Sequence, residues 1–445
     1  MHSVRTTMIV FAMFISGAAV AQTPPEAPPD PAAPRPAEPP AAPPPEVAPA
    51  PPMAPPPAPA AMAPTPSPPA ESYVPPAQAA FKVETPNKST IKLGLLVQPQ
   101  FQSSQPRFGT PTSALNGWGE NLYIRRTRVL LGGTLFGAFD YFFDTDFPNL
   151  FLGQNVTTTD AMGVMTTNVV KNTPGMNIQD AFITWKAAGD LFKLDVGYML
   201  PPLAHNAVQG ATTLYMWDYF AYSFRQGNLF GSSGNPIGRD TGVQARGLVA
   251  GGVVEYRLGL FQGLRQAPTA TDSGARNFFR TTGRVQINLM DPETGFFYAG
   301  TYLGTKKVLS IGGSFDFQDT STTDAYKYFA GDAIVDLPLG PAGLLTAQVN
   351  VAHWDGGTTI ALPKSTAVMG EAGFLIAAAH LSPIIHVEHL WVTGPNNDET
   401  YSGGGLAFWP YGHNTNLKAF YTYRKAQAAM NGGSQVNVQW QLYFF

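Results

Sequence analysis

The stretch VNVQWQLYFF, residues 436–445, decides the fold because its side chains alternate strictly. Every second residue from Val436 to Phe444 is apolar, and amides lie between them at Asn437, Gln439 and Gln441. Alternation with a period of two predicts a β-strand with one apolar face and one polar face. A strand at the end of a chain frays unless neighbours pair with it. The pattern therefore predicts pairing on both edges, as in a closed sheet.

The sequence after Phe81 repeats this alternation and lacks the signature of a membrane-spanning helix. It contains no apolar run near the roughly 20 residues that such a helix needs. Segments of about ten residues alternate between apolar and polar side chains, which is typical of a transmembrane antiparallel β-barrel. The chain's net charge of −3 arises from +1 at Arg5 and −4 in residues 22–80, so the remainder is neutral. A neutral domain argues against a nucleic-acid partner.

The connections between these segments predict the number of strands. With residues 91–102 as the first strand, long loops alternate with short turns, as they do in such barrels. Long loops are expected at 103–119, 148–177, 200–238, 263–277, 318–325, 355–365, 393–400 and 426–434, and short turns at 137, 188–189, 250–251, 340–341, 381–382 and 411–413. The segment FFYAGTYLG, residues 296–304, would make the strand count odd. Placing it in an extended turn over 290–307 restores the alternation and gives about 16 strands.

The first 80 residues are expected to lie outside the barrel domain, which is predicted at 81–445. Arg5, the apolar run from Met8 to Ile15 and the small residues at 19–21 predict a secretory signal peptide over residues 1–21. Residues 22–80 hold 25 of the 42 prolines, and we expect a disordered periplasmic linker there because such a composition cannot build a core. The chain has no cysteine, which excludes disulfides and thiolate chemistry.

The cost of placing a charge in lipid predicts which face of each strand points inward. That cost is on the order of 2–4 kcal/mol at the bilayer midplane and is small in a wet lumen. In RTTGRVQINL, residues 280–289, the rule places both arginines in the lumen. The predicted pore-lining residues are Arg126, Arg128, Asp140, Asp144, Asp146, Asp240, Arg246, Glu255, Arg257, Arg280 and Arg284. Because acidic and basic residues nearly balance among the expected lumenal positions, strong selectivity is not predicted.

One strand cannot be assigned without a cost. In YIRRTRVLL, residues 123–131, turning Arg126 and Arg128 inward leaves Arg125 on the lipid face. We expect the long side chain of Arg125 to reach the headgroup region near a rim, as arginines at a membrane interface do.

Four stretches carry a resemblance to a known family. They are LYIRRTRVLLGGTLFGAFDYFFDTDF (122–147), IQDAFITWKAAGDLFKLDVGYMLPPLAHNAVQG (178–210), IGRDTGVQARGLV (237–249) and YRLGLFQG (256–263). They resemble the phosphate-selective porins, the O and P porins of Gram-negative outer membranes, and the similarity extends over nearly everything after Thr85. The resemblance implies a barrel of about 16 strands, usually trimeric, with an inward-folded third loop and lumenal arginines that attract anions. The chain departs from the family at its end, where Phe444 and not Phe445 is in phase with the lipid-facing residues.

The third long loop contains LYMWDYFAYSFRQGNLFG, residues 214–231. So many aromatic side chains would be unfavourable on an exposed loop. The loop therefore packs either against the inner wall of the barrel or against a neighbour in a trimer. The first alternative, which we prefer, places a constriction at Trp217, Asp218, Tyr219 and Arg225.

Sites of other kinds find less support in the sequence. The stretch IIHVEHL offers His386, Glu388 and His389 as metal ligands, but strand alternation places His389 opposite the other two. The aspartates at 140, 144 and 146 share one face, where a solvated acidic patch beside arginines is favoured over a cation site. No Ser-His-Asp arrangement or phosphate-binding glycine loop stands out, so no catalytic residue, metal or cofactor is predicted.

Together these patterns predict an outer-membrane porin of a Gram-negative bacterium that admits small hydrophilic solutes by passive diffusion, with a weak preference for anions such as phosphate. The expected partners are outer-membrane lipid, two further copies in a homotrimer, and the barrel-assembly machinery, which would read residues 436–445. The alternative is a structural anchor whose Pro-rich arm extends toward the cell wall. At about 3.1 Å per residue, the 59 residues of that arm reach on the order of 180 Å.

Overall fold

The computed structural model of the 445-residue chain describes residues 73, 75, 80–105, 118–159, 165–227, 238–265, 278–321, 324–358, 360–394, 397–427 and 432–445. The predicted signal peptide and nearly all of the predicted linker lie outside the described residues. In the part of the chain that the structure describes, no helix is both long enough and apolar enough to cross a membrane.

β-Strands dominate the described residues. The strands are β1 (Phe81–Glu84), β2 (Thr90–Gln105), β3 (Gly119–Leu135), β4 (Phe139–Asp146), β5 (Gly153–Thr159), β6 (Met165–Lys171), β7 (Asn177–Trp185), β8 (Lys193–Met199), β9 (Asp240–Val249), β10 (Val254–Phe261), β11 (Arg280–Asn288), β12 (Val308–Asp319), β13 (Ala325–Pro338), β14 (Gly343–Asp355), β15 (Ser365–Ile376), β16 (Leu381–Val392), β17 (Glu399–Tyr411), β18 (Thr415–Ala426) and β19 (Gly433–Phe444). Short 3₁₀ helices are η1 (His205–Val208), η2 (Ala250–Gly252), η3 (Gly340–Ala342) and η4 (Ala377–Ala379).

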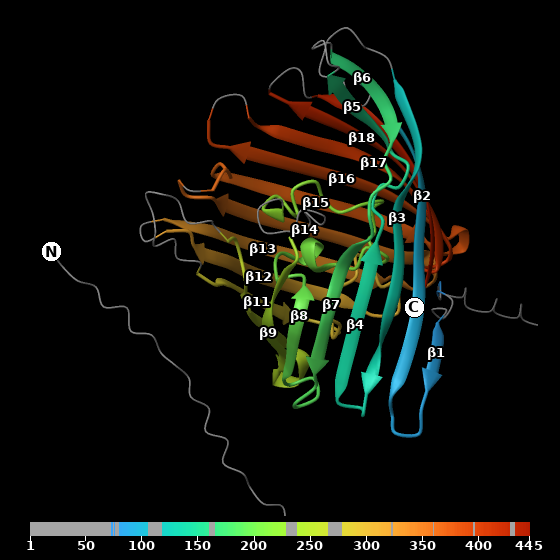
Figure 1. Cartoon of the computed structure of the whole chain (residues 1–445). Coiled ribbons are helices and arrows are strands. Elements are labelled where there is room, and N and C mark those ends of the chain that lie inside the picture. Colours follow the sequence, from blue (N-terminus) through green and yellow to red (C-terminus); the bar gives the residue numbers. More distant parts are fainter. Residues whose placement is uncertain are drawn as a thin grey trace, which may run out of the picture. The chain divides into compact units, whose positions relative to one another are not determined.

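Most of these strands form a closed antiparallel barrel (Figure 1). The main sheet has 17 strands, and removing the appended β1 leaves 16 in the ring. Each strand from β2 pairs with the next along the chain, except that β4 pairs with β7 across the separate hairpin of β5 and β6. The ring closes where β19 pairs with β2 and Phe444 lies opposite Leu95. The predicted fold class is confirmed, and closure leaves no open edge in the ring.

The short strand β1 pairs with the part of β2 that the terminal strand β19 does not reach. It pairs from Phe81 opposite Leu93 to Glu84 opposite Thr90. The partner β19 reaches only to Leu95 on that edge. The two strands therefore occupy successive parts of the same edge of β2.

Successive connections between strands lie alternately at the two ends of the barrel. The end with the long loops is here called the long-loop end, and the end with the short turns is called the short-turn end. As predicted, the segment between β11 and β12 contains no strand. One predicted turn, at 381–382, is wrong. Leu381 begins β16, and the turn consists of η4 followed by His380 in a left-handed conformation at φ 51°. Pro383 also lies within β16, opposite Leu406.

The two faces of the wall differ as the alternation predicts. In β19 the side chains of Trp440 and Leu442 are 59% and 51% exposed, whereas those of Gln439 and Gln441 are 1% and 0% exposed. The exposed apolar side chains form the outer face, and the buried amides face the interior. The faces predicted for the terminal strand are therefore confirmed.

A β-bulge overturns the expected position of Arg125. The paired residues on either side of the bulge are Val97 with Thr127 and Pro99 with Ile124, so β3 has one residue more than β2 in this interval. The extra residue breaks the alternation and turns both Arg125 and Arg126 toward the interior. The prediction that Arg125 reaches the headgroups is wrong because it assumed an unbroken strand.

Two segments enter the barrel and meet inside it. The inner loop (200–227) comes from the long-loop end after β8, and the inner turn (289–307) comes from the short-turn end after β11 (Figure 1). Backbone N–H groups join them, from Gly210 to the Tyr298 carbonyl at 2.9 Å and from Tyr298 to the Val208 carbonyl at 3.1 Å. The inner loop also buries apolar side chains, including Tyr215 and Phe220, against Trp354 and other inward-facing residues of the wall. One side of the lumen is thus a packed core.

Candidate functional site

The lumen keeps a cavity of about 680 Å³ on the side of the barrel that the packed core does not fill. One wall of this lumenal cavity consists of β3, β4, β7, β8 and β9, and the other consists of residues from both inner segments. Its charged lining residues are Arg128, Asp140, Asp144, Asp180, Lys193, Arg239 and Arg246.

The predicted pore-lining residues divide into two groups. Arg128, Asp140, Asp144 and Arg246 line the lumenal cavity. The others are buried on the inner face of the wall, and they are Arg126, Asp146, Asp240, Glu255, Arg257, Arg280 and Arg284. Several of these are covered by the inner segments, as Arg257 shows by donating to the carbonyls of Gly295 and Phe296 at 3.1 and 2.7 Å. A role in lining a solute path remains a prediction for the whole set.

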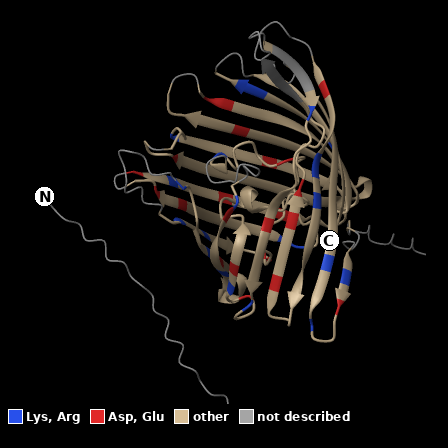
Figure 2. Cartoon of the chain, in the orientation of Figure 1, with Lys and Arg blue, Asp and Glu red and all other residues tan. Residues whose placement is uncertain are grey.

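Ion pairs neutralise the inward-facing arginines. The pairs are Arg125 and Arg126 with the shared Asp218, Arg128 with Asp144 and Asp146, Arg239 with Asp180, Arg246 with Asp195, Arg257 with Glu255, Arg280 with Asp240 and Asp316, and Arg284 with Asp332. Figure 2 shows the basic residues of β3 near the acidic residues of β4 and β7. Buried charges are tolerated when they are paired in this way, and a paired wall presents little net charge to a solute.

A second bulge shapes the acidic side of the lumenal cavity. Asp144 of β4 lies opposite Asp180 of β7, but the next pair joins Thr145 to Ile178, so Gln179 is the extra residue. Gln179 and Asp180 are both buried, at 2% and 0% exposed. The bulge therefore turns two consecutive polar side chains toward the interior of the barrel, which strand alternation alone does not predict.

Asp218 anchors the inner loop to the first bulge. Its carboxylate accepts from Arg125 Nε at 2.9 Å and from Arg126 Nη2 at 2.5 Å. Burial by itself raises the pKa of Asp218, but the two guanidinium groups outweigh burial and lower that pKa below its ordinary value. The Tyr219 ring lies 5.6 Å from the Arg126 guanidinium, and its hydroxyl donates to the Gln209 carbonyl at 2.7 Å. Asp218 and Tyr219 of the predicted constriction are therefore held together inside the barrel.

Inward-facing residues of the opposite wall hold the rest of the inner loop. Lys418 donates from Nζ to the carbonyls of Leu214 and Met216 at 2.6 and 2.8 Å. Glu388 accepts from the backbone N–H of Ala221 at 2.8 Å. These contacts tie the loop backbone to β16 and β18. The other two predicted constriction residues lie on this side, since Arg225 donates to Ser365 Oγ at 3.0 Å and Trp217 packs against the core.

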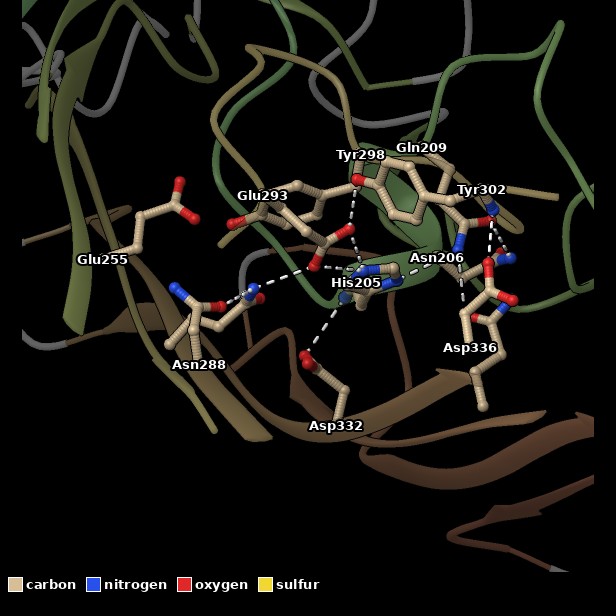
Figure 3. A network of polar contacts seen from close by, with 12 residues as sticks. His205, Asn206, Gln209, Glu255, Asn288, Glu293, Tyr298, Tyr302, Asp332 and Asp336 are labelled. Atoms are coloured by element: carbon tan, nitrogen blue, oxygen red, sulfur yellow. Dashed lines mark hydrogen bonds and ion pairs between the residues drawn. The ribbon is translucent and has the colours of Figure 1, made fainter. Parts of the chain in front are cut away.

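A buried polar network joins the two inner segments (Figure 3). His205 of η1 contacts Glu293 of the inner turn through Nε2 at 3.0 Å. The amide nitrogen of Gln209 donates to His205 Nδ1 at 2.9 Å, and because an amide nitrogen can only donate, Nε2 carries the proton given to Glu293. The His205 backbone N–H donates to Asp332 of β13 at 3.0 Å. Burial raises and His205 lowers the pKa of Glu293, and the result lies below its ordinary value.

The residues weighed as metal ligands have other partners. His386 Nδ1 lies 3.1 Å from the Met216 sulfur, and His389 is on the outer side, where Nδ1 lies 2.7 Å from Thr400 Oγ1. Asp140 pairs with Lys186 at 2.7 Å. Across the described ranges, no group of three or more histidine, aspartate or glutamate side chains is arranged to hold a metal ion.

Sequence reasoning missed several residues of the lumenal cavity. The side chains of Phe142 and Phe182 point into the barrel, as do the polar side chains two positions away on the same strands. Strand alternation could therefore have predicted their inward direction. Phe296 and Phe445 also line the cavity. Alternation places Phe445 in the inward phase of Gln439 and Gln441, but no local pattern predicts the path of the inner turn that carries Phe296. Pro75 lines the cavity at its short-turn end, from the margin of the predicted linker.

Comparison with known proteins gives matches in structure alone. No family model matches the chain, and no curated protein matches it. A solved anion-selective porin from Comamonas acidovorans matches with a TM-score of 0.54 and 13% sequence identity, over 80% of this chain and 100% of that chain. The outer membrane channel DcaP of Acinetobacter baumannii matches with a TM-score of 0.47 and 12% identity, over 82% of this chain and 100% of that chain.

The chain has the porin fold. At such low identity the likeness concerns the arrangement of strands, and membership of the phosphate-selective family remains an expectation from the quoted stretches. A shared fold does not establish a shared function, so the side chains inside the barrel are what indicates function.

Proposed function

We propose that this protein is an outer-membrane porin through which small hydrophilic solutes diffuse passively. The observation that carries the proposal is a closed 16-stranded ring with an apolar outer face and an interior cavity of about 680 Å³ lined by charged side chains. A ring without edges is stable in hydrocarbon because every backbone group can pair within it. A charged interior cavity holds water and gives polar solutes a favourable environment.

The proposed selectivity is a weak preference for anions, with phosphate as one of several permitted ions. The paired arginines support weak selectivity, because each guanidinium faces a carboxylate at short range. Channel selectivity depends on charges that the partner groups leave uncompensated near the narrowest point. The reversal potential in a salt gradient measures this preference. Strong cation selectivity, or block of chloride current by micromolar phosphate, would contradict it.

Conductance in planar bilayers tests the channel itself. The purified full-length protein should produce ohmic current, and a homotrimer should close in three equal steps. Absence of current over many confirmed insertions would overturn the proposal. Steps of a single size that never group in threes would leave the channel proposal standing and remove the proposed trimer.

One observation favours an anchor as a second function. Tyr73, near the end of the predicted linker, donates from its hydroxyl to the Trp409 carbonyl at 3.0 Å, and its ring meets His380 edge-on at 4.9 Å. Burial raises the pKa of Tyr73 to about 12. These contacts attach the segment to the short-turn end, from which an arm could extend to the cell wall. Co-sedimentation of the intact protein, but not of a Δ22–70 variant, with isolated peptidoglycan would support the anchor. Equal sedimentation of both proteins would contradict it.

A further inference from the structure

A cluster of phenylalanine rings lines the lumenal cavity beside its charged wall. The members of this ring cluster are Phe142, Phe182, Phe296, Phe297 and Phe445. Phe142 lies 5.8, 5.7 and 5.6 Å from the ring centres of Phe182, Phe297 and Phe445, and Phe296 lies 4.4 Å from Phe182. Phe182 is buried, whereas the other four rings are partly exposed.

Local structure builds this ring cluster in a defined position. A Cβ atom on Gly94 or Gly132 would lie 2.7 Å from the Phe445 ring, so only glycine at these positions leaves room for the ring. Phe296 is fixed through its carbonyl, which accepts from Arg257 Nη1 at 2.7 Å. The Arg246 guanidinium lies 5.5 Å from the Phe296 ring centre. The apolar surface is therefore held in place by contacts on both sides.

Partly exposed rings are unexpected on the wall of a path that carries only hydrated ions. Contiguous apolar surface in water is unfavourable and commonly marks a binding site. A cavity of about 680 Å³ also lies within the range of small-molecule sites, which combine apolar and aromatic walls with a few placed polar groups.

The charged side chains beside the ring cluster are compensated by ion pairs, and Phe142 and Phe182 lie on the same strands, β4 and β7, as some of them. Arg128, Arg239 and Arg246 all pair with aspartates. A solute entering the cavity therefore meets fixed aromatic rings and, beside them, polar side chains that carry little net charge. This arrangement discriminates by the ring of a solute more than by the sign of its charge.

We propose that the ring cluster is a binding subsite for small monocyclic aromatic solutes that carry one compact polar or charged group. The inference rests on the proposed channel function and names the class of solute that the channel retains. The aromatic ring packs against Phe142, Phe296 and Phe445, and the polar group faces the paired wall. Aromatic pairs add about 0.5–1.5 kcal/mol to the burial of area, and 1.4 kcal/mol corresponds to a tenfold change in affinity.

Single-channel block by matched solutes tests the subsite. In protein that conducts KCl, benzoate should interrupt the current at a concentration roughly tenfold lower than acetate, and benzylamine roughly tenfold lower than methylamine. Equal block within both pairs would overturn the subsite and leave the channel intact. A ring effect for only one sign of charge would overturn the stated class. Absence of KCl current would instead contradict the proposed channel function.

Substitutions by leucine separate ring binding from packing. Phe142→Leu and Phe445→Leu keep apolar volume in the ring cluster but remove the flat ring, so both should reduce the ratio of benzoate to acetate block at least threefold while KCl conductance persists. Phe329→Leu, on the outer face, is the matched control and should leave the ratio unchanged. An unchanged ratio in both lumenal variants, with heat stability lost instead, would show that the ring cluster only packs the inner turn.

Discussion

The carboxylate of Asp218 lies 2.5 Å from Arg126 Nη2, although the two residues are 92 positions apart in the chain. The contact joins the inner loop to a bulge in β3, and Arg125 of the same bulge donates to the second oxygen of that carboxylate. A bulge allows the side chains of two consecutive arginines to donate to the same carboxylate. The inner loop therefore depends on an irregularity in the wall.

Replacing this carboxylate should change both selectivity and stability. Asp218→Asn leaves the buried guanidinium of Arg126 and the partly exposed guanidinium of Arg125 without a counter-charge, so the reversal potential should shift toward anions and the oligomer should dissociate at lower temperature. Removal of one partner from a buried pair typically costs about 3–5 kcal/mol, and the remaining amide oxygen moderates this cost. Asp355→Asn, whose carboxylate pairs with the exposed Lys364 in a loop, is the control and should show neither change.

The effect of Asp218 should not vary with pH in the neutral and mildly acidic range. Burial raises the pKa of Asp218, but Arg125 and Arg126 outweigh burial and lower it, and further titratable groups that interact with Asp218 are Tyr123, Tyr219 and Lys418. A lowered pKa contributes stability that is present above the ordinary value of 3.8 and is lost as pH falls through the folded value. The difference in reversal potential between wild type and Asp218→Asn should stay constant from about pH 8 to pH 5. A difference that disappears near neutral pH would show that Asp218 is not the ionised partner.

Lys418 should control the position of the inner loop. Lys418→Met removes the ammonium group that donates to Leu214 and Met216, so we expect a noisier single-channel current and a change in mean conductance of roughly 1.5-fold or more from loss of these charge-assisted hydrogen bonds. Lys425→Met, on the exposed side of the same strand, should conduct like the wild type. Two indistinguishable variants would mean that the core alone holds the loop.

The terminal strand offers a test of which face lies in lipid. Trp440→Arg places a charge on the outer face, which costs on the order of 2–4 kcal/mol at midplane depth, and little heat-resistant oligomer should form. Gln435→Arg, on the partly exposed inner side near the start of β19, is the control and should assemble, because its side chain donates to Asn437 Oδ1 at 2.9 Å and does not hold the backbone of another segment. Gln441 is unsuitable as that control, because its side-chain nitrogen donates to the carbonyls of Thr212 and His413 at 2.9 and 2.6 Å. Equal yields from Trp440→Arg and Gln435→Arg would contradict the assigned faces.

Deletion of Phe445 tests which of the two terminal phenylalanines the assembly machinery needs. Phe444 keeps its pairing opposite Leu95 and its lipid-facing phase without Phe445, so the shortened protein should still reach the outer membrane. Loss of the ring from its place over Gly94 should lower the heat stability of the oligomer. Complete failure of assembly would show that the machinery reads the last position irrespective of the face on which it lies.

The barrel could be predicted from the sequence because its pattern is local. Alternation and the cost of charge in lipid act on each strand separately, and they placed Arg280 and Arg284 on the inner face, where both are buried. Alternation fails where the register changes, and the inward turn of Arg125 and Gln179 depends on such changes. A bulge is recognised by comparing the number of residues in two paired strands, and a single sequence does not reveal which residues pair.

The interior was harder to predict because its contacts are distant in the chain. Aromatic content indicated that residues 214–231 avoid water, but not that Lys418 holds the backbone there. The inner turn was identified by counting strands, and nothing in its sequence predicted the contact of Glu293 with His205. Ion pairs across the lumen likewise join residues that belong to different strands, so the balance of charge was visible from composition while the individual partners were not.

The closure between β19 and β2 determines when the barrel can be completed. Gln439 donates to Gln100 across this seam, and 339 positions separate the two residues. During synthesis β2 emerges near the beginning of the barrel and its native neighbour near the very end. The first strand therefore waits with one edge open until translation and export are finished, and contacts of such long range slow folding and leave the edge prone to aggregation. We therefore expect that another protein must cover this edge of β2 until β19 is available to pair with it.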